Sequence, residues 1–385
     1  MMRSLPYAVF AHVANASPLG RFGVAFAQSA IVLAAIWPLA AAAIEERPRG
    51  AAAATVFIAV GTSLAWFVCF LMPDVMGAVV VAFALTLIAV VDRIDAAGRV
   101  ALALLAAFAV MTHYGNIALA AGLIGAALLM RGALGGLSWR LAAFAVAPLA
   151  LALAANALVG AVATGKAGVT VAPLRPPILL ARSIEDGPAR WHLEEACPEA
   201  GYAVCEVFAD GVPDNVNAAL WGPGGLAHAG RATLDRIRAE EPLILARAFA
   251  EHPAAQTWSF AGNAVRQFFR IGVSRLTKGV DRWVNWMLLA SYVAAVVALA
   301  LVAILCRRRA PEASALAALT LLALVLNAAV FGGLSTPADR YQGRIAWMAP
   351  MMALILLARA DIRAFLFSAA AKSDAPGGVR MESER

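Results

Sequence analysis

The sequence carries little charge for its length. Of its 385 residues only 14% are Asp, Glu, Lys or Arg, whereas 62% are hydrophobic. A soluble domain of this size could not cover so much apolar surface with so few charged side chains. Apolar runs of about 20 residues recur and match the hydrocarbon thickness of a bilayer. The sequence therefore predicts an all-α polytopic membrane protein.

The motifs of nucleotide and hydrolase chemistry are also missing. There is no P-loop, no Rossmann glycine fingerprint, no G-x-S-x-G and no H-E-x-x-H. Cytosolic nucleotide chemistry is therefore not expected. The net charge of +7 does not indicate a nucleic-acid partner, because cytoplasmic loops of membrane proteins collect Lys and Arg. No motif predicts a cofactor.

Cysteine is scarce, with four residues in all. Cys197 and Cys205 stand in the segment CPEAGYAVC, where seven intervening residues with a glycine let a small loop close. In an oxidising periplasm this pair is expected to form a disulfide. No spacing resembles a zinc site, and His192, His228 and His252 are interpreted as ordinary surface residues.

Nine candidate spans follow from the apolar runs, and the fourth and fifth share one uncharged stretch of 31 residues. A polar break at His113 favours two short helices there, and one long tilted helix stays open as the alternative. The predicted spans are 22–44, 52–72, 75–91, 100–112, 114–130, 141–163, 284–305, 314–333 and 345–358.

The basic residues predict the orientation of these spans. The connections 45–50, 92–99, 131–140 and 306–313 with the tail 359–385 hold 14 Lys and Arg, against 4 in the opposite set. By the positive-inside rule the first set is cytoplasmic. The protein is thus expected in a bacterial inner membrane, with the lipid bilayer as its partner and its large polar loop on the periplasmic side.

The expected organisation has five parts: an interfacial N-terminal helix (1–21), a six-span bundle (22–163), a mostly helical extracytoplasmic loop (164–283), a three-span bundle (284–358) and a cytoplasmic tail (359–385). The loop holds 13 basic and 13 acidic residues, which argues against a polyanion-binding module. Within it, the aromatic segment 258–271 either lies in the headgroup layer or forms the core of the loop.

The stretch 335–350, STPADRYQGRIAWMAP, carries the strongest candidate site. Arg340 and Arg344 suit phosphate oxygens, while Tyr341 adds a hydrogen bond and Asp339 a charge. At the headgroup layer these residues could hold a lipid-linked phosphate. The alternative is a solvated turn in which Tyr and Arg serve as interface anchors.

Three further candidates are expected on the same outer side. Asp74 is a base, a metal ligand or the N-cap of the helix starting at residue 75, so a divalent cation stays open there. His113 binds phosphate, transfers a proton or is simply a hydrogen-bonded turn residue. Arg175, in a Pro-rich extended stretch, is a weaker headgroup candidate. Gln28, Asn156 and Asn327, inside apolar runs, are expected to bridge helices.

In this arrangement the chain resembles the GT-C-type polytopic glycosyltransferases. The motifs are MPD (72–74), THYGN (112–116) and DRYQGR (339–344). The resemblance implies an enzyme that takes sugar from a polyprenyl-phosphate donor, with Arg340, Tyr341 and Arg344 in the donor-phosphate region. The acidic first loop of the family has no match here, so no catalytic base is carried over. Either coding begins upstream, with one further span and loop, or this chain is not an active member of the family.

Two other functions stay open on the sequence. A lipid or solute transporter would need functional polar residues at mid-membrane depth, and only a few amides are present there. A non-catalytic scaffold or assembly protein would use the loop 164–283 to bind a partner.

Overall fold

The computed structural model describes residues 4–46, 48–165, 176–359 and 362, and its regular structure is entirely helical. Five helical segments are long and apolar enough to cross a membrane: Arg21–Ala41, Tyr114–Ala133, Trp139–Val162, Arg282–Leu305 and Pro311–Gly333. The helical architecture is confirmed, and these five segments agree with a multi-pass membrane protein. The count of nine spans and their sidedness stay predictions.

The first half of the chain builds most of a helical bundle around α5. Its helices are α1 (Leu5–Asn15), α2 (Arg21–Glu46), α3 (Pro48–Gly61), α4 (Leu64–Cys69), α5 (Met76–Ala89), α6 (Ala96–Met111), α7 (Tyr114–Ala133) and α8 (Trp139–Thr164). Every residue of α5 except Ala89 is buried. A helix that is apolar on all sides suits such a central position.

The predicted span 52–72 is wrong as a single helix. It divides into α3 and α4 at Thr62 and Ser63. The backbone carbonyls of Val68 and Phe70, at the end of α4, accept hydrogen bonds from Gln28 Nε2, each at 2.9 Å. Gln28 thus bridges helices as predicted, and it satisfies carbonyls that the short helix leaves open.

The polar break at residue 113 separates α6 from α7, so the stretch 100–130 forms two helices. His113 is the N-cap residue of α7, and its Nδ1 accepts a hydrogen bond from the backbone N–H of Gly115 at 3.2 Å. The N-terminal helix α1 lies against this end of α6, because Ser4 Oγ donates to the carbonyl of Met111 at 2.9 Å. Tyr7 of α1 is buried and donates to Gln28 Oε1.

The large polar segment forms a helical unit with its own apolar core. This loop domain comprises α9 (Ile178–Asp186), α10 (Pro188–Ala200), α11 (Ala203–Val207), α12 (Val216–Trp221) and α13 (Arg231–Glu251). The predicted disulfide between Cys197 and Cys205 is confirmed. The surface interpretation of His192 is wrong: its ring is buried, and Nδ1 lies 2.9 Å from Glu251 Oε2.

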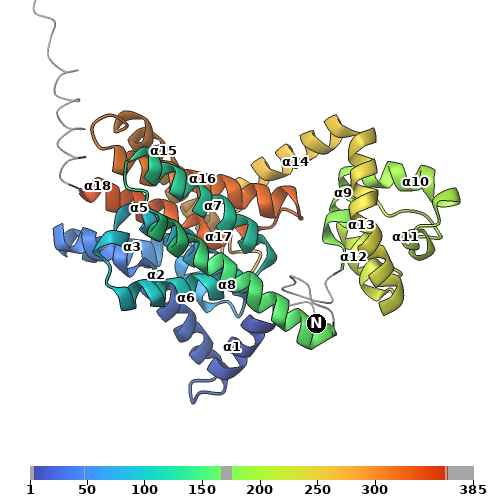
Figure 1. Ribbon diagram of the computed structural model, residues 1–385, viewed down its shortest axis with the longest axis horizontal. Coiled ribbons are helices and arrows are strands. Elements are labelled where there is room, and N and C mark those ends of the chain that lie inside the picture. Colours follow the sequence, from blue (N-terminus) through green and yellow to red (C-terminus); the bar gives the residue numbers. More distant parts are fainter. Residues whose placement is uncertain (1–3, 47, 166–175, 360–361, 363–385) are drawn as a thin grey trace, which may run out of the picture.

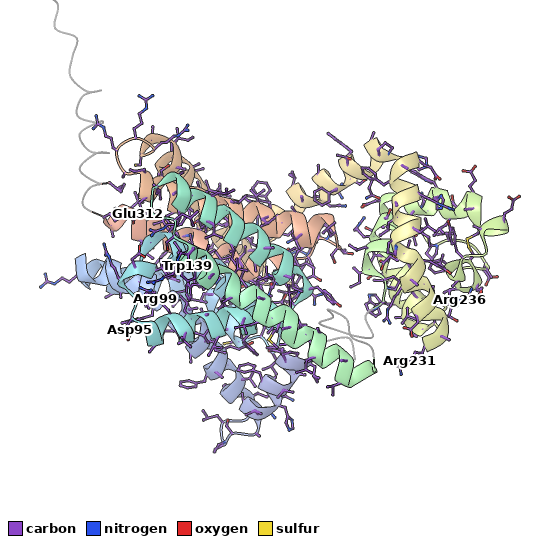
Figure 2. All side chains as sticks on the ribbon, in the orientation of Figure 1. Asp95, Arg99, Trp139, Arg231, Arg236 and Glu312 are labelled. Atoms are coloured by element: carbon purple, nitrogen blue, oxygen red, sulfur yellow. A yellow bond between two sulfur atoms is a disulfide. The ribbon has the colours of Figure 1, made fainter. Side chains whose placement is uncertain are left out.

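The remaining helices return from the loop domain to the bundle. They are α14 (Pro253–Phe268), α15 (Arg282–Leu305), α16 (Pro311–Ala328), a π-helical turn (Ala329–Gly333), α17 (Asp339–Ala346) and α18 (Met348–Ala358). Figure 1 shows α14 reaching from the loop domain to the end of α16. In Figure 2, Asp95, Arg99 and Glu312 lie at the opposite end of the bundle, which agrees with one shared side for the connections 92–99 and 306–313.

The aromatic segment 258–271 does not form the core of the loop domain, so that alternative is wrong. None of its aromatic residues belongs to that core. Trp258 is 81% exposed, whereas Phe260 packs on Gly333 and the Phe268 ring lies 5.5 Å from the Tyr292 ring. Phe260 and Phe268 therefore pack α14 against the bundle.

Close packing between α14 and the π-helical turn requires glycine at position 332. A Cβ atom there would lie 2.3 Å from Gln267 Cβ and 2.7 Å from the Asn263 carbonyl oxygen. We predict that Gly332→Ala lowers the free energy of unfolding by about 2 kcal/mol, because the two segments must move apart. Unfolding of the purified protein in mild detergent, titrated with SDS, measures this loss.

Gly262, on α14 itself, provides the matched control. A Cβ atom at that position meets nothing within 4 Å. Gly262→Ala should therefore leave stability unchanged or raise it by about 0.5–1 kcal/mol through helix propensity. Equal stability in the two variants would contradict the packing described here.

Candidate functional site

The stretch predicted as a charged turn folds in part into the short helix α17. Its inner face is buried, and it places Gln342, Gly343 and Arg344 against the bundle. Gly343 is required for this approach, because a Cβ atom would lie 2.8 Å from the Phe67 ring. Ser63 Oγ donates to the Gly343 carbonyl across the break between α3 and α4. The break between α3 and α4 therefore provides the surface against which α17 packs.

Arg344 is fully buried, which the sequence did not predict. Its Nη2 donates to Asn327 Oδ1 at 2.8 Å, and its Cζ lies 3.7 Å from the centre of the Phe331 ring. Gly77 makes room for the guanidinium, since a Cβ there would lie 3.1 Å from Arg344 Cζ. Burial lowers the pKa of Arg344 to about 10, although the charge of Asp74 acts in the opposite direction. The side chain therefore remains a cation at neutral pH.

A buried amide network holds this helix in register. Asn327 Nδ2 donates to the Tyr341 carbonyl and to Gln342 Oε1, both at 2.8 Å. Gln342 Nε2 in turn donates to Tyr292 Oη at 3.1 Å and to the carbonyl of Leu324. Asn327 thus bridges elements as predicted, and its role is to fix the backbone that carries Tyr341 and Arg344.

Asp74 provides the nearby negative charge. It is buried in the turn Pro73–Val75, and its charge acts on both Arg340 and Arg344. The N-cap alternative is wrong, because Val75 occupies the N-cap position of α5. The negative charge of Asp74 favours the cationic form of both guanidinium groups.

His113 and Tyr341 form the outer part of the same assembly. The His113 ring lies 5.0 Å from the Phe331 ring and 6.4 Å from the Tyr341 ring, between centroids. Arg340 packs over the Tyr341 ring and donates from Nη2 to Tyr341 Oη at 2.9 Å. His113, Arg340 and Tyr341 are each partly exposed.

Five predicted residues therefore converge from three separate segments, and we call them the polar cluster: Asp74, His113, Arg340, Tyr341 and Arg344. Two other candidates do not join it. Asp339 faces Arg270 and Arg275, at 3.6 and 3.9 Å. Arg175 lies outside the described residues.

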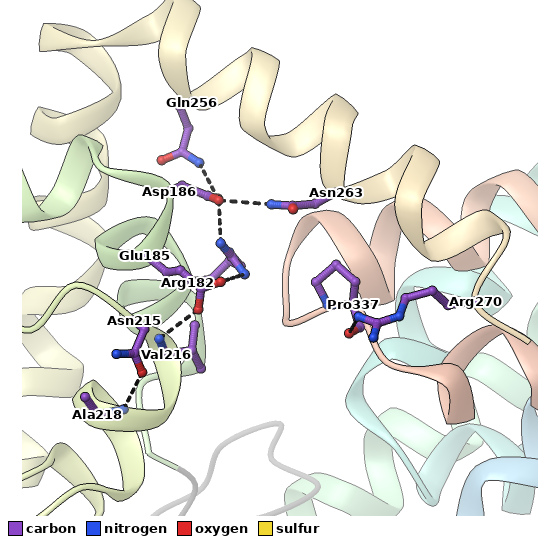
Figure 3. A network of polar contacts seen from close by, with 10 residues as sticks. All are labelled: Arg182, Glu185, Asp186, Asn215, Val216, Ala218, Gln256, Asn263, Arg270 and Pro337. Carbon is purple, nitrogen blue, oxygen red and sulfur yellow. Dashed lines mark hydrogen bonds and ion pairs between the residues drawn. The ribbon is translucent and has the colours of Figure 1, made fainter. Parts of the chain in front are cut away.

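Sequence reasoning missed the residues that position the cluster from α14 and from Arg270, which follows its end. Gln267 is fully buried, and its amide both accepts from the N–H of Ala338 (2.8 Å) and donates to its carbonyl (3.0 Å). Arg270 donates to the carbonyl of Pro337, as Figure 3 shows. The missed signal was a polar residue every three or four positions along one face of α14. Phe331 gave no signal, since a Phe at the end of an apolar run is ordinary.

The charges and donors of the polar cluster suit an anion. The charge of the Asp74 carboxylate acts on two guanidinium groups, and a phenol and an imidazole stand at the partly exposed edge. Phosphate oxygens are the ligands that such donors prefer. Among the described residues no group of three His, Cys, Asp or Glu side chains is placed to hold a metal ion.

Comparisons of the chain with protein-family models, with curated proteins and with solved structures give no match.

Asn327 is the position at which the network can be tested. We predict that Asn327→Leu lowers the free energy of unfolding by about 3 kcal/mol, because Arg344 loses its acceptor while it stays buried. Thr320→Val, on the same helix, is the control, since the hydroxyl of this buried Thr bonds to the Leu316 carbonyl one turn away. Titration with SDS compares the two variants, and equal stability would contradict the network.

Proposed function

We propose that the protein is a membrane glycosyltransferase-like protein that acts on a polyprenyl-phosphate-linked sugar at the extracytoplasmic face. The observation that carries the proposal is the convergence of Arg340, Tyr341, Arg344, Asp74 and His113. A solvated turn would not bury one arginine completely, place it over the Phe331 ring and set it within the influence of the Asp74 charge.

Arg340 and Arg344 contribute to phosphate binding in different ways. Arg340 is partly exposed, so its guanidinium can reach the donor phosphate, with the Tyr341 hydroxyl beside it. Arg344 is buried and acts from beneath as a fixed positive charge. When a sugar is transferred, an acceptor hydroxyl oxygen bonds to its anomeric carbon and gives up its proton. The bond between that carbon and the phosphate oxygen breaks, and the phosphate leaves with the electron pair. Positive charge fixed at that point stabilises the leaving group.

The side of the membrane follows from the charge bias of the connections. Residues 334–344 belong to the set with few basic residues, which the positive-inside rule places outside the cytoplasm. A polyprenyl-phosphate donor lies in the bilayer with its phosphate at the headgroup layer. The location proposed for the polar cluster thus suits a bacterial inner membrane and a donor that arrives laterally through lipid.

Phosphate recognition is tested first by binding. We predict that Arg340→Gln weakens binding of polyprenyl phosphate to the nanodisc-embedded protein by about 10–100-fold, the loss of one charge-assisted hydrogen bond. Arg266→Gln is the control, because Arg266 is an exposed arginine of α14 outside the cluster. Unphosphorylated polyprenol serves as the second ligand, and its binding should be unaffected by either change. Identical phosphate binding by both variants would reject the assignment.

Activity is tested separately in cells. We predict that Arg340→Glu abolishes formation of the glycan while the amount of protein in the membrane stays at the wild-type level, because the reversed charge repels the donor phosphate. Arg266→Glu should leave the glycan unchanged. Normal glycan in the Arg340→Glu strain would show that the protein is not the transferase, whatever it binds.

A further inference from the structure

A second site lies away from the polar cluster, where the loop domain meets α14. It is a cleft of about 370 Å³ between α9, α13, α14 and the end of the π-helical turn. Its apolar walls come from Leu179, Leu245, Phe249, Phe260 and Leu334. Binding pockets for small ligands begin near 300 Å³ and are mostly apolar with few polar groups. The volume therefore fits one narrow chain better than a branched headgroup.

The position of the cleft indicates where its ligand comes from. Gly333, which lines it, is the last residue of the candidate span Pro311–Gly333. The cleft thus opens at the level where this span ends, beside the hydrocarbon layer. Phe249 and Leu334 at its walls are 51% and 43% exposed, so apolar surface continues to the outside. Apolar surface therefore adjoins the cleft at the end of a candidate span, which suits an aliphatic ligand.

The polar groups of the cleft indicate which chemical group the bound hydrocarbon chain ends in. Arg182 is nearly buried and is bound by two carboxylates, to Asp186 at 2.6 Å and to Glu185 at 3.1 Å. One guanidinium against two carboxylates leaves no positive charge for an anionic headgroup. Figure 3 shows this network, in which Gln256 and Asn263 of α14 also donate to Asp186.

Uncharged hydrogen-bonding groups are available beside it. Ser183 and Gln256, bonded to each other at 2.6 Å, and Thr257 line the same cleft. Arg182 Nε is buried and has no hydrogen-bond partner among the described residues, so the uncharged groups of Ser183, Gln256 and Thr257 are the ones that line the cleft. A hydroxyl group satisfies such donors and acceptors without adding charge.

We propose that this cleft binds a single aliphatic chain that ends in an uncharged hydroxyl group, taken from the adjacent membrane leaflet. The ligand class is a long-chain alcohol or a neutral lipid of that form. The site is separate from the polar cluster, and its occupation does not depend on phosphate binding there.

Photolabelling tests the proposal. The full chain in nanodiscs is treated with a diazirine-bearing dodecanol, and the labelled residues of α9 and α13 are mapped by mass spectrometry. Both helices lie outside the candidate spans, and saturation with competition distinguishes labelling in the cleft from general labelling by the bilayer. Labelling should be saturable, and excess dodecanol should remove it while dodecanoate does not. Competition by both to the same extent, or labelling that never saturates, would overturn the proposal.

Two substitutions on α13 sharpen the test. Leu245→Trp fills the cleft and should lower labelling of α9 by about tenfold, since the chain loses its apolar contact. Leu243→Trp is the matched control, because Leu243 is 47% exposed and does not line the cleft. Unchanged labelling in Leu245→Trp contradicts the assignment. The competition between alcohol and acid in the wild-type chain decides the question if this variant does not fold. Arg340→Gln should label like the wild type, which separates this site from the polar cluster.

Discussion

The burial of the Arg344 guanidinium is the constraint on which the rest of the site depends. A cation removed from water is tolerated only with compensating charge and hydrogen bonds. Asn327 supplies an acceptor, Phe331 an aromatic face and Asp74 a nearby negative charge. Each partner comes from a different element, so one side chain links α17 to α16, to the π-helical turn and to the turn Pro73–Val75. Arg340 and Tyr341 then project from a rigid base.

A second constraint links this base to the loop domain through α14. The inner face of α14 meets Asp186 at one end, through Gln256 and Asn263, and the backbone of Ala338 at the other, through Gln267. Between them Phe260 packs on Gly333, where a larger residue would not fit. These contacts follow one stripe of a single helix, so α14 joins the loop domain directly to the segment that carries Arg340. The apolar cleft lies on the same helix.

Charge scarcity and apolar runs predicted the helical architecture, and polar residues at the ends of runs predicted which side chains would gather. Those signals work because a charge near a bilayer needs a partner. They do not show whether a side chain points into the bundle or out to solvent. Arg344 looked as exposed as Arg340, yet it is fully buried, since the helical period of α17 turns it inward. The span 52–72 looked continuous, because no Pro or charge marks the break that Gln28 and Ser63 stabilise. Phe331 and Gln267 needed the tertiary structure, because their roles arise from neighbours distant in sequence.

The central claim is that the polar cluster receives the phosphate of a lipid. An electron cryo-microscopy map of the protein in nanodiscs with polyprenyl phosphate tests it most directly. Our account predicts phosphate density within hydrogen-bonding distance of the Arg340 guanidinium and the Tyr341 hydroxyl, absent from a map collected with polyprenol. Phosphate density bound elsewhere on the protein, with Arg340 still paired only to Tyr341, would contradict it.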